Sequence, residues 1–281
     1  MQIGKYKVQM IDAGRYKLDG GAMFGVVPRT LWQKENPADE KNRIQMSLNT
    51  LLLVSAGRVI LIDSGVGNKF SDKFKEIYDI DYSQTSLMKS LAEKNIQPED
   101  VTDVILTHLH FDHVGGATHS DPDGQIRPQF PNANYYVQKK QLEWAQKGFP
   151  KDRTSYISEN FEPLNGSGKL KILEGPQKLM EGVELILSEG HTVAQQMVKI
   201  SGQSENLVYL ADLIPMTAHL NLPWVMAYDL HPVQTIQEKE EILETAIKKE
   251  WLLFFEHDPR IHCGQVYKSE KGYQLKNSIK L

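Results

Sequence analysis

The chain has 281 residues, 40% of them hydrophobic, and a net charge of -4 from 32 basic and 36 acidic residues. This size and composition allow a substantial buried core. The single cysteine, Cys263, excludes an internal disulfide framework, and no basic block supports a nucleic-acid partner. No apolar run approaches the roughly eighteen residues of a membrane span, and residues 1–7 lack a signal-peptide core. The sequence therefore predicts a cytoplasmic protein that binds neither nucleic acid nor membranes.

In the first half of the chain, short apolar runs predict strands at residues 7–11, 49–54, 59–62 and 103–106. One helix is predicted at 86–94, because Asn95 and Pro98 supply stop signals. Residues 118–134 are rich in Pro, Asp and Gly, which favours an ordered loop over a site. The polar residues 147–169 are typical of a lid.

The second half repeats this series. Strands are predicted at 135–138, 183–187, 198–200, 207–210 and 252–256, and a helix at 233–249. A hairpin of residues 265–268 and 272–275 closes the chain. Because strands come in runs with few helices between them, we expect two stacked mixed sheets with helices on their outer faces.

The densest motif is His108-Leu109-His110-Phe111-Asp112-His113, which follows the predicted strand at 103–106. Imidazole and carboxylate are the ligands that zinc and similar divalent metals prefer. Buried histidine and aspartate cost free energy unless they are paired or coordinated. A metal site is therefore favoured over a polar loop that happens to be rich in histidine.

Three further candidates each follow an apolar strand: His191, Asp212 and His257. A single histidine at the end of a strand is usually a solvated loop residue. The repetition at three strand ends, together with the six-residue motif, favours a site for two metals.

The order HxHxDH, then His, Asp and His resembles the metallo-β-lactamase superfamily of binuclear metal hydrolases. The resemblance implies an αβ/βα sandwich, with two mixed sheets face to face, in a single domain over residues 1–281. It also implies the ligands of the first metal, which are His108, His110 and His191. The implied ligands of the second metal are Asp112, His113 and His257, and Asp212 would bridge both metals.

The resemblance also assigns supporting roles. Asp63 would hold a ligand histidine, since metal-bound imidazole usually donates its other N–H to such a group; a turn aspartate that caps its own loop is the alternative. Two cations would provide a bridging hydroxide near neutral pH. Asp112 would carry a proton to the leaving group as a catalytic residue.

The stretch with the glycine-flanked pair Met23-Phe24 is similar to the branch that contains YtnP-like quorum-quenching lactonases and methyl-parathion-hydrolase-like enzymes. The pair could line an apolar pocket beside the metals, and a strand edge packed into the core is the alternative. The branch implies that hydrophobic N-acyl-homoserine lactones are the substrates. Apolar side chains suit an acyl chain or aryl group, and His219 lies in the segment after Asp212. The predicted pocket residues are Met23, Phe24, Phe149, His219, Trp224 and Met226.

One departure keeps a second substrate class open. Many acyl-homoserine lactonases carry a tyrosine three residues after the bridging aspartate, where this chain has Pro215. A hydrolase of organophosphate triesters or carboxyl esters is therefore the alternative. Zinc is the expected metal, with manganese, iron or cobalt as alternatives, and the family suggests a homodimer.

Overall fold

The computed structural model describes residues 1–281 and contains two seven-stranded sheets and one two-stranded sheet. The chain divides into two compact units. Unit 1 comprises Met1–Gly14 and Leu48–Gly175, and unit 2 comprises Arg15–Ser47 and Pro176–Leu281. This division into units does not test the single domain predicted over residues 1–281, which stays a prediction.

The first sheet has the strand order β1-β2-β3-β4-β5-β8-β9. Its strands are β1 (Gln2–Ile3), β2 (Tyr6–Asp19), β3 (Arg43–Ser55), β4 (Arg58–Ile62), β5 (Asp103–Ile105), β8 (Asn134–Gln138) and β9 (Leu170–Leu173). The pairs β1–β2 and β3–β4 are antiparallel, whereas β4–β5, β5–β8 and β8–β9 are parallel. The predicted strands of the first half, and the one at 135–138, all fall in this sheet.

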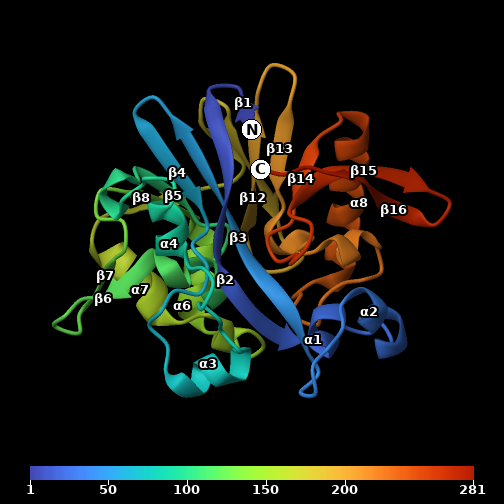
Figure 1. Cartoon of the computed structure of the whole chain (residues 1–281), viewed down its shortest axis with the longest axis horizontal. Helices are drawn as coiled ribbons and strands as arrows, with labels where there is room; N and C mark the ends of the chain where they lie inside the picture. The colour runs from blue at the N-terminus through green and yellow to red at the C-terminus, as the bar shows by residue number, and fades with distance from the viewer. The chain divides into compact units, whose positions relative to one another are not determined.

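Short helices and one hairpin complete unit 1. They are α3 (Asp72–Tyr78), α4 (Leu87–Ala92), η1 (Pro98–Asp100), α5 (Phe111–Val114), η2 (Gly115–Ala117), β6 (Thr118–Ser120), β7 (Ile126–Pro128), α6 (Lys139–Lys147), η3 (Arg153–Ser155) and α7 (Ser158–Gly166). The predicted helix at 86–94 is α4, which begins after Ser86, whose side chain accepts from Lys89 N. The expected loop at 118–134 contains the β6–β7 hairpin, which lies beside α7 (Figure 1).

Sequence analysis missed several helices of unit 1. The polar segment 147–169, for which no helix was predicted, contains η3 and α7. Polar sequences such as α7 form helices when one face packs, and its buried residues are Asn160, Phe161 and Leu164. Tertiary packing, rather than local propensity, therefore decides these elements.

The second sheet has the strand order β10-β11-β12-β13-β14-β15-β16. Its strands are β10 (Gln177–Met180), β11 (Val183–Ser188), β12 (Gln195–Ser201), β13 (Asn206–Tyr209), β14 (Leu252–Phe254), β15 (Cys263–Ser269) and β16 (Gly272–Ser278). Only β13 and β14 pair in parallel, and the other neighbours are antiparallel. Both large sheets are thus mixed, as predicted.

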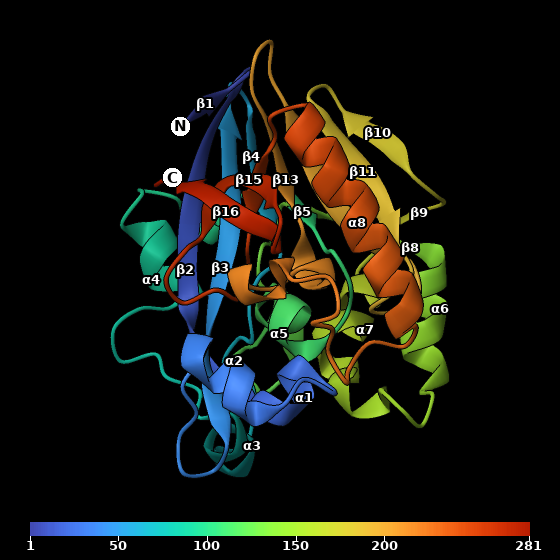
Figure 2. The same cartoon turned by 90° about the vertical axis from the view of Figure 1, so that its right-hand side faces the viewer.

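The helices of unit 2 are α1 (Gly20–Phe24), α2 (Arg29–Glu35), η4 (Ala211–Leu213), η5 (Thr217–Leu220) and α8 (Pro232–Lys248). The helix predicted at 233–249 is α8, and Figure 2 shows it lying against the second sheet. Its apolar face packs into a core with β13, β14 and β15. The glycine-flanked pair Met23-Phe24 lies in α1 and not at a strand edge, and the Asp19 side chain accepts from Ala22 N at the start of this helix.

Two mixed sheets flanked by helices confirm the predicted α/β fold class. None of the helices combines the length and the apolar character that crossing a bilayer requires.

Replacing Leu243 with alanine tests the core beneath α8. Leu243 is fully buried in that core, so Leu243→Ala should lower the free energy of unfolding by about 2–5 kcal/mol. Val233 lies on the same helix and is 71% exposed, and Val233→Ala should change it by less than about 0.5 kcal/mol. Denaturant unfolding measures both, and equal effects would contradict the packing of α8.

Candidate metal centre

The six-residue motif lies at the carboxyl end of β5, between β4 and β8. The strands β4 and β5 are parallel neighbours, with Ile62 opposite Ile105, so the segments that follow them leave the sheet at one edge. Asp63 follows β4, and the motif follows β5, with α5 beginning at Phe111. The four predicted ligands of the motif are all buried: His108, His110, Asp112 and His113.

Asp63 ties these two segments together. Its carboxylate accepts hydrogen bonds from Thr107 N at 2.8 Å, Thr107 Oγ1 at 2.6 Å and His113 Nδ1 at 3.1 Å. The φ angle of Asp63 is 58°, a left-handed conformation that few residues other than glycine adopt. The fully buried carboxylate is therefore compensated by three donors, and the ligand role of His113 stays a prediction.

Close approach of two backbone segments fixes the other end of the motif. Ser64 N and Ser64 Oγ donate to the carbonyl oxygen of His113 at 2.8 and 2.9 Å, and Gly116 N donates to Gly65 O at 3.0 Å. A Cβ atom at Gly116 would overlap the carbonyl oxygen of Ser64. Glycine at this position therefore allows the segment after Asp63 to pass against the motif.

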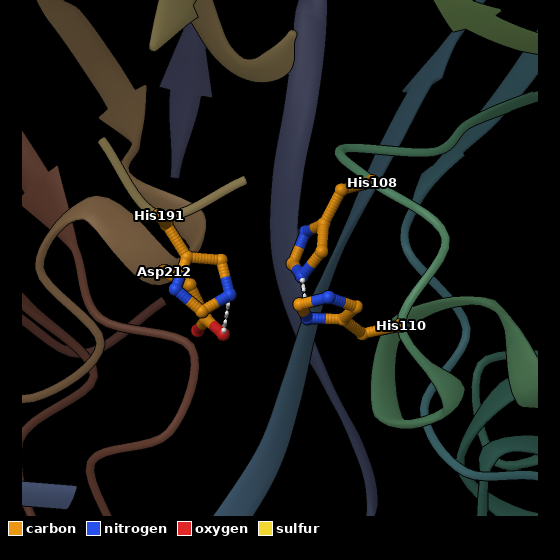
Figure 3. Close-up of side chains that lie close together, drawn as sticks. All are labelled: His108, His110, His191 and Asp212. Atoms are coloured by element: carbon orange, nitrogen blue, oxygen red, sulfur yellow. Dashed lines mark hydrogen bonds and ion pairs between the residues drawn. The ribbon is translucent and has the colours of Figure 1, made fainter. Parts of the chain in front are cut away.

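The rings of His108 and His110 meet edge to face, with planes at 79° to one another. The Thr107 hydroxyl donates its hydrogen to Asp63, and its oxygen lies 3.1 Å from His108 Nδ1. The hydroxyl oxygen therefore accepts a hydrogen bond from His108 Nδ1. In a neutral imidazole the His108 Nε2 atom then carries a lone pair, and it lies 3.0 Å from His110 Nδ1. Figure 3 shows the two rings pointing toward one another.

The other three predicted ligands lie in unit 2. His191 follows β11, and Asp212 and His257 follow β13 and β14. Because β13 and β14 are parallel, with Tyr209 opposite Phe254, their following segments leave at the same edge. The Nε2 atoms of His191 and His257 lie 3.2 and 3.1 Å from the two oxygens of Asp212, and Figure 3 shows the pair of His191 and Asp212.

The second nitrogen of each imidazole in unit 2 is held by an acceptor. His191 Nδ1 lies 2.9 Å from Asp229 Oδ1, and His257 Nδ1 lies 2.9 Å from the carbonyl oxygen of Ser47. Carboxylate and carbonyl oxygens can only accept, so each Nδ1 carries a hydrogen. A neutral ring then presents its Nε2 lone pair to Asp212.

The donor atoms in both units fit divalent cations. In unit 1, His113 Nδ1 donates to Asp63, which leaves its Nε2 lone pair 4.0 Å from Asp112 Oδ2. Lone pairs that face carboxylate oxygens repel them unless a proton or a cation lies between. Imidazole nitrogen and carboxylate oxygen are the ligands of zinc and related metals, so a divalent cation would relieve the repulsion within each unit.

Sequence analysis did not identify Asp229, the buried partner of His191. Its second oxygen accepts from Met226 N at 3.1 Å. The sequence carries no signal for this role, because the histidine lies 38 residues away and an aspartate before a helix ordinarily suggests a capped turn.

Glu238 of α8 is a second residue that sequence analysis missed. Its carboxylate accepts from Ser188 Oγ at 2.7 Å, Glu189 N at 2.9 Å and Gly190 N at 3.2 Å. These residues lead from β11 to His191, so α8 fixes the segment that carries this predicted ligand. An acidic residue within a helix usually indicates a solvated face, so the sequence pattern does not predict the contacts of Glu238 with residues 188–190.

Phe24 is the centre of an aromatic cluster in unit 2. Its ring stacks on Trp32 and His219 at centroid distances of 5.3 and 4.9 Å and meets the Trp224 ring edge-on at 5.5 Å. Ala227 N donates to Ala22 O at 2.8 Å, which joins the α1 segment to the segment 217–227. Five pocket candidates belong to these two segments: Met23, Phe24, His219, Trp224 and Met226.

The sixth candidate, Phe149, lies in unit 1 after α6. Its ring contacts Trp144 at a centroid distance of 5.1 Å, and the residue is 43% exposed. Contact of any of the six residues with substrate stays a prediction.

His219 is a buried neutral imidazole. Its Nε2 atom donates to the carbonyl oxygen of Met23 at 2.8 Å, and its Nδ1 atom has no hydrogen-bond partner. Burial, together with the charge of Lys239, lowers the pKa of His219 to about 4.

Lys239 of α8 anchors the segment that carries Trp224. Its Nζ atom donates to the carbonyl oxygens of Asn221, Leu222 and Trp224 at 3.0, 3.1 and 2.8 Å. Burial lowers the pKa of Lys239 to about 7. The helix that fixes the approach to His191 therefore also fixes part of the aromatic cluster.

Replacing Asp63 with asparagine tests its support of the motif. Asparagine tolerates the left-handed backbone but cannot accept with both oxygens. Metal affinity should fall about 10- to 100-fold, because outer partners of metal-binding histidines have effects of this size. Competition with a chelator measures the affinity, and Asp123→Asn, at an exposed turn, is the matched control. Unchanged affinity in Asp63→Asn would show that the carboxylate is dispensable.

The neutral state of His219 predicts a loss of stability in acid. As the pH falls from 6.5 to 4, the unfolded chain takes up a proton at this histidine while the folded protein does not, so stability is lost across that window. His219→Asn should reduce this loss by up to about 3 kcal/mol. Denaturant unfolding between pH 4 and 7 compares it with wild type and with His231→Asn, at an exposed histidine. Parallel curves for wild type and His219→Asn would contradict the prediction.

A family model described as the metallo-beta-lactamase superfamily matches residues 45–257, more than half of the chain. The chain is similar to an N-acyl homoserine lactonase of Bacillus cereus, with 25% identity over 90% of this chain and 93% of that protein. A probable metal-dependent hydrolase from Staphylococcus aureus has a structure with a TM-score of 0.87 and 32% identity, covering 99% of this chain and 100% of that one. AidC, a dizinc quorum-quenching lactonase, shares the fold at 22% identity and a TM-score of 0.80, covering 100% of this chain and 97% of its own.

Proposed function

The chain belongs to the metallo-beta-lactamase superfamily of metal-dependent hydrolases, and on that premise we propose that it opens lactone rings with two metal ions. N-acyl-homoserine lactones are the proposed substrates, so the biological role would be quorum quenching. One observation carries the metal dependence: the imidazoles of His191 and His257 present lone pairs to the two oxygens of Asp212. The similarity to an acyl-homoserine lactonase over 90% of the chain supports the substrate.

The proposed ligand sets are those that the family resemblance implies. One metal ion would be held by His108, His110 and His191, and the other by Asp112, His113 and His257. Asp212 would bridge the two ions. The paired lone pairs within each unit support these assignments, and the ligand chemistry suits zinc, with manganese, iron or cobalt as alternatives.

The two metal ions would lower the pKa of a water molecule enough to make hydroxide available near neutral pH. The residues of the chain have separate tasks. Asp63, Asp229 and the Ser47 carbonyl keep the Nδ1 hydrogens of three ligand histidines in place, which leaves each Nε2 free of hydrogen. Asp112, buried in the first turn of α5, would move a proton to the alkoxide that leaves when the ring opens.

A hydrophobic acyl chain would suit the aromatic and methionine side chains around Phe24. Apolar lining with a few polar groups is typical of sites for small molecules. Met23, Trp224 and Met226 are the proposed wall residues, with His219 as a neutral acceptor among them. A homodimer and a cytoplasmic location stay predictions.

A hydrolase of organophosphate triesters or carboxyl esters is the second candidate. The observation that favours it is Pro215, which stands where many acyl-homoserine lactonases have a tyrosine. Proline has no side-chain donor, and its carbonyl oxygen accepts from His257 N at 3.0 Å. The Asp212 segment therefore offers no hydroxyl at that position for a lactone carbonyl.

Proton release tests the function. Addition of a long-chain N-acyl-homoserine lactone to zinc-loaded protein should produce one acid equivalent per ring opened, because hydrolysis yields a carboxylic acid. Asp212→Ala should lose at least one metal ion and nearly all turnover, since it removes the proposed bridge.

Two results would contradict parts of this proposal. If metal analysis finds two ions per chain but no acid forms, the lactone is rejected, and an aryl phosphotriester and an aryl ester are tested next. If Asp212→Ala keeps both ions and full activity, Asp212 is not the bridge.

A further inference from the structure

Ring opening places negative charge on the lactone carbonyl oxygen, and a donor fixed near that oxygen accelerates such reactions. The chain has no side-chain donor at Pro215, so a donor to this oxygen must come from another segment. This inference rests on the proposed lactone or ester hydrolysis. Phenols and other donors that contact the predicted ligands themselves are the candidates.

Tyr156 meets this requirement in unit 1. Its ring lies against the His110 ring at a centroid distance of 4.8 Å, with the two planes tilted by 58°. The residue is half-buried, so one part of it packs while another remains accessible. No sequence motif marks it, because it lies in the polar segment 147–169, far along the chain from the motif.

The segment around Tyr156 is firmly anchored. Tyr156 N donates to Arg153 O at 3.3 Å, which closes η3, and Trp144 Nε1 donates to the buried Asp152 carboxylate at 2.8 Å. The helix α7, which follows Tyr156, is bonded to the segment just after the six-residue motif, because Thr118 Oγ1 donates to Glu159 O at 2.9 Å. These bonds fix the backbone on both sides of Tyr156, which lowers the cost of ordering this segment on substrate binding.

We propose that Tyr156 is a catalytic residue whose neutral phenol donates a hydrogen bond to the oxygen of the attacked carbonyl. One water molecule supplies both the hydroxide that adds to the carbonyl carbon and the proton that Asp112 then carries. The carbonyl electron pair moves to the oxygen that faces the phenol. When that pair returns, the ring C–O bond breaks, and the alkoxide takes the proton that Asp112 carries. The phenol keeps its own proton throughout, so the products are one carboxylate, one hydroxyl group and one released proton.

Tyr78 of α3 is the competing phenol. Its ring contacts the Phe111 ring at 4.8 Å and the Phe74 ring at 4.5 Å. Burial and the charge of Asp112 raise the pKa of Tyr78. Tyr78 thus packs within an aromatic stack, whereas Tyr156 contacts a predicted ligand of the first metal, and this contact favours Tyr156.

Three variants separate the possible roles. Tyr156→Phe keeps the ring against His110 and removes only the hydroxyl, whereas Tyr156→Leu removes the ring as well. Tyr78→Phe is the matched removal of the other phenol. The measurements are metal content, kcat and KM for the substrate that wild type hydrolyses, and calorimetric affinity for the ring-opened N-acyl-homoserine.

Tyr156→Phe should lower kcat about a hundredfold, the usual effect of losing one oxyanion donor, while metal content and KM stay at the wild-type level. Its affinity for the ring-opened product should fall about tenfold, because a hydrogen bond to a carboxylate oxygen is lost. Tyr78→Phe should leave both readouts unchanged. Tyr156→Leu should show the same loss of kcat. Its metal content is measured in parallel, because it reports whether the ring contact with His110 supports metal binding.

The opposite results are equally clear. Wild-type kcat in Tyr156→Phe, or the hundredfold loss in Tyr78→Phe instead, overturns the assignment. Loss of metal in Tyr156→Phe overturns it too, because Tyr156 would then only position His110. If wild type opens no lactone, the proposed substrate fails, and the same variants are compared on the aryl ester that it hydrolyses; a retained loss there keeps the donor role.

Discussion

The position of one hydrogen on each imidazole is the constraint on which the proposed centre depends. Asp63, Asp229 and the carbonyl oxygen of Ser47 each accept from an Nδ1 atom, of His113, His191 and His257 in turn. Each acceptor fixes a tautomer and leaves an Nε2 lone pair aimed at carboxylate oxygen. In the absence of a proton or a cation these contacts are repulsive, so the bonds that order the histidines also direct each Nε2 lone pair to where a metal ion would be favoured.

The sheets explain why these residues meet within each unit. Each large sheet contains a parallel pair, β4–β5 in one and β13–β14 in the other, and each pair delivers two loops to one edge. The residue after β4, Asp63, and the residue before Asp212, Ala211, both have a positive φ, of 58° and 47°. Such backbone costs free energy and persists where surrounding contacts hold it, which is common at functional sites.

The helix α8 joins stability to the proposed site. Its apolar face, with Leu243, fills the core of unit 2. Its polar side chains Glu238 and Lys239 bond to the segment before His191 and to the carbonyl oxygens of residues 221, 222 and 224, respectively. A change that displaces α8 would therefore disturb both the predicted ligand His191 and the aromatic cluster around Phe24.

The sequence by itself determined the family, the α/β class and most strands, because apolar runs and the HxHxDH pattern are local signals. It also named the donor residues, since histidine and aspartate at strand ends are visible one by one. Only the tertiary structure decided α1, α6 and α7 and the partners of the histidines. Asp229 and Glu238 look like ordinary turn and helix residues until folding brings them to His191 and to Gly190. Tyr156 likewise has no local signal, because its contact with His110 joins segments that are distant in the chain and meet only through packing.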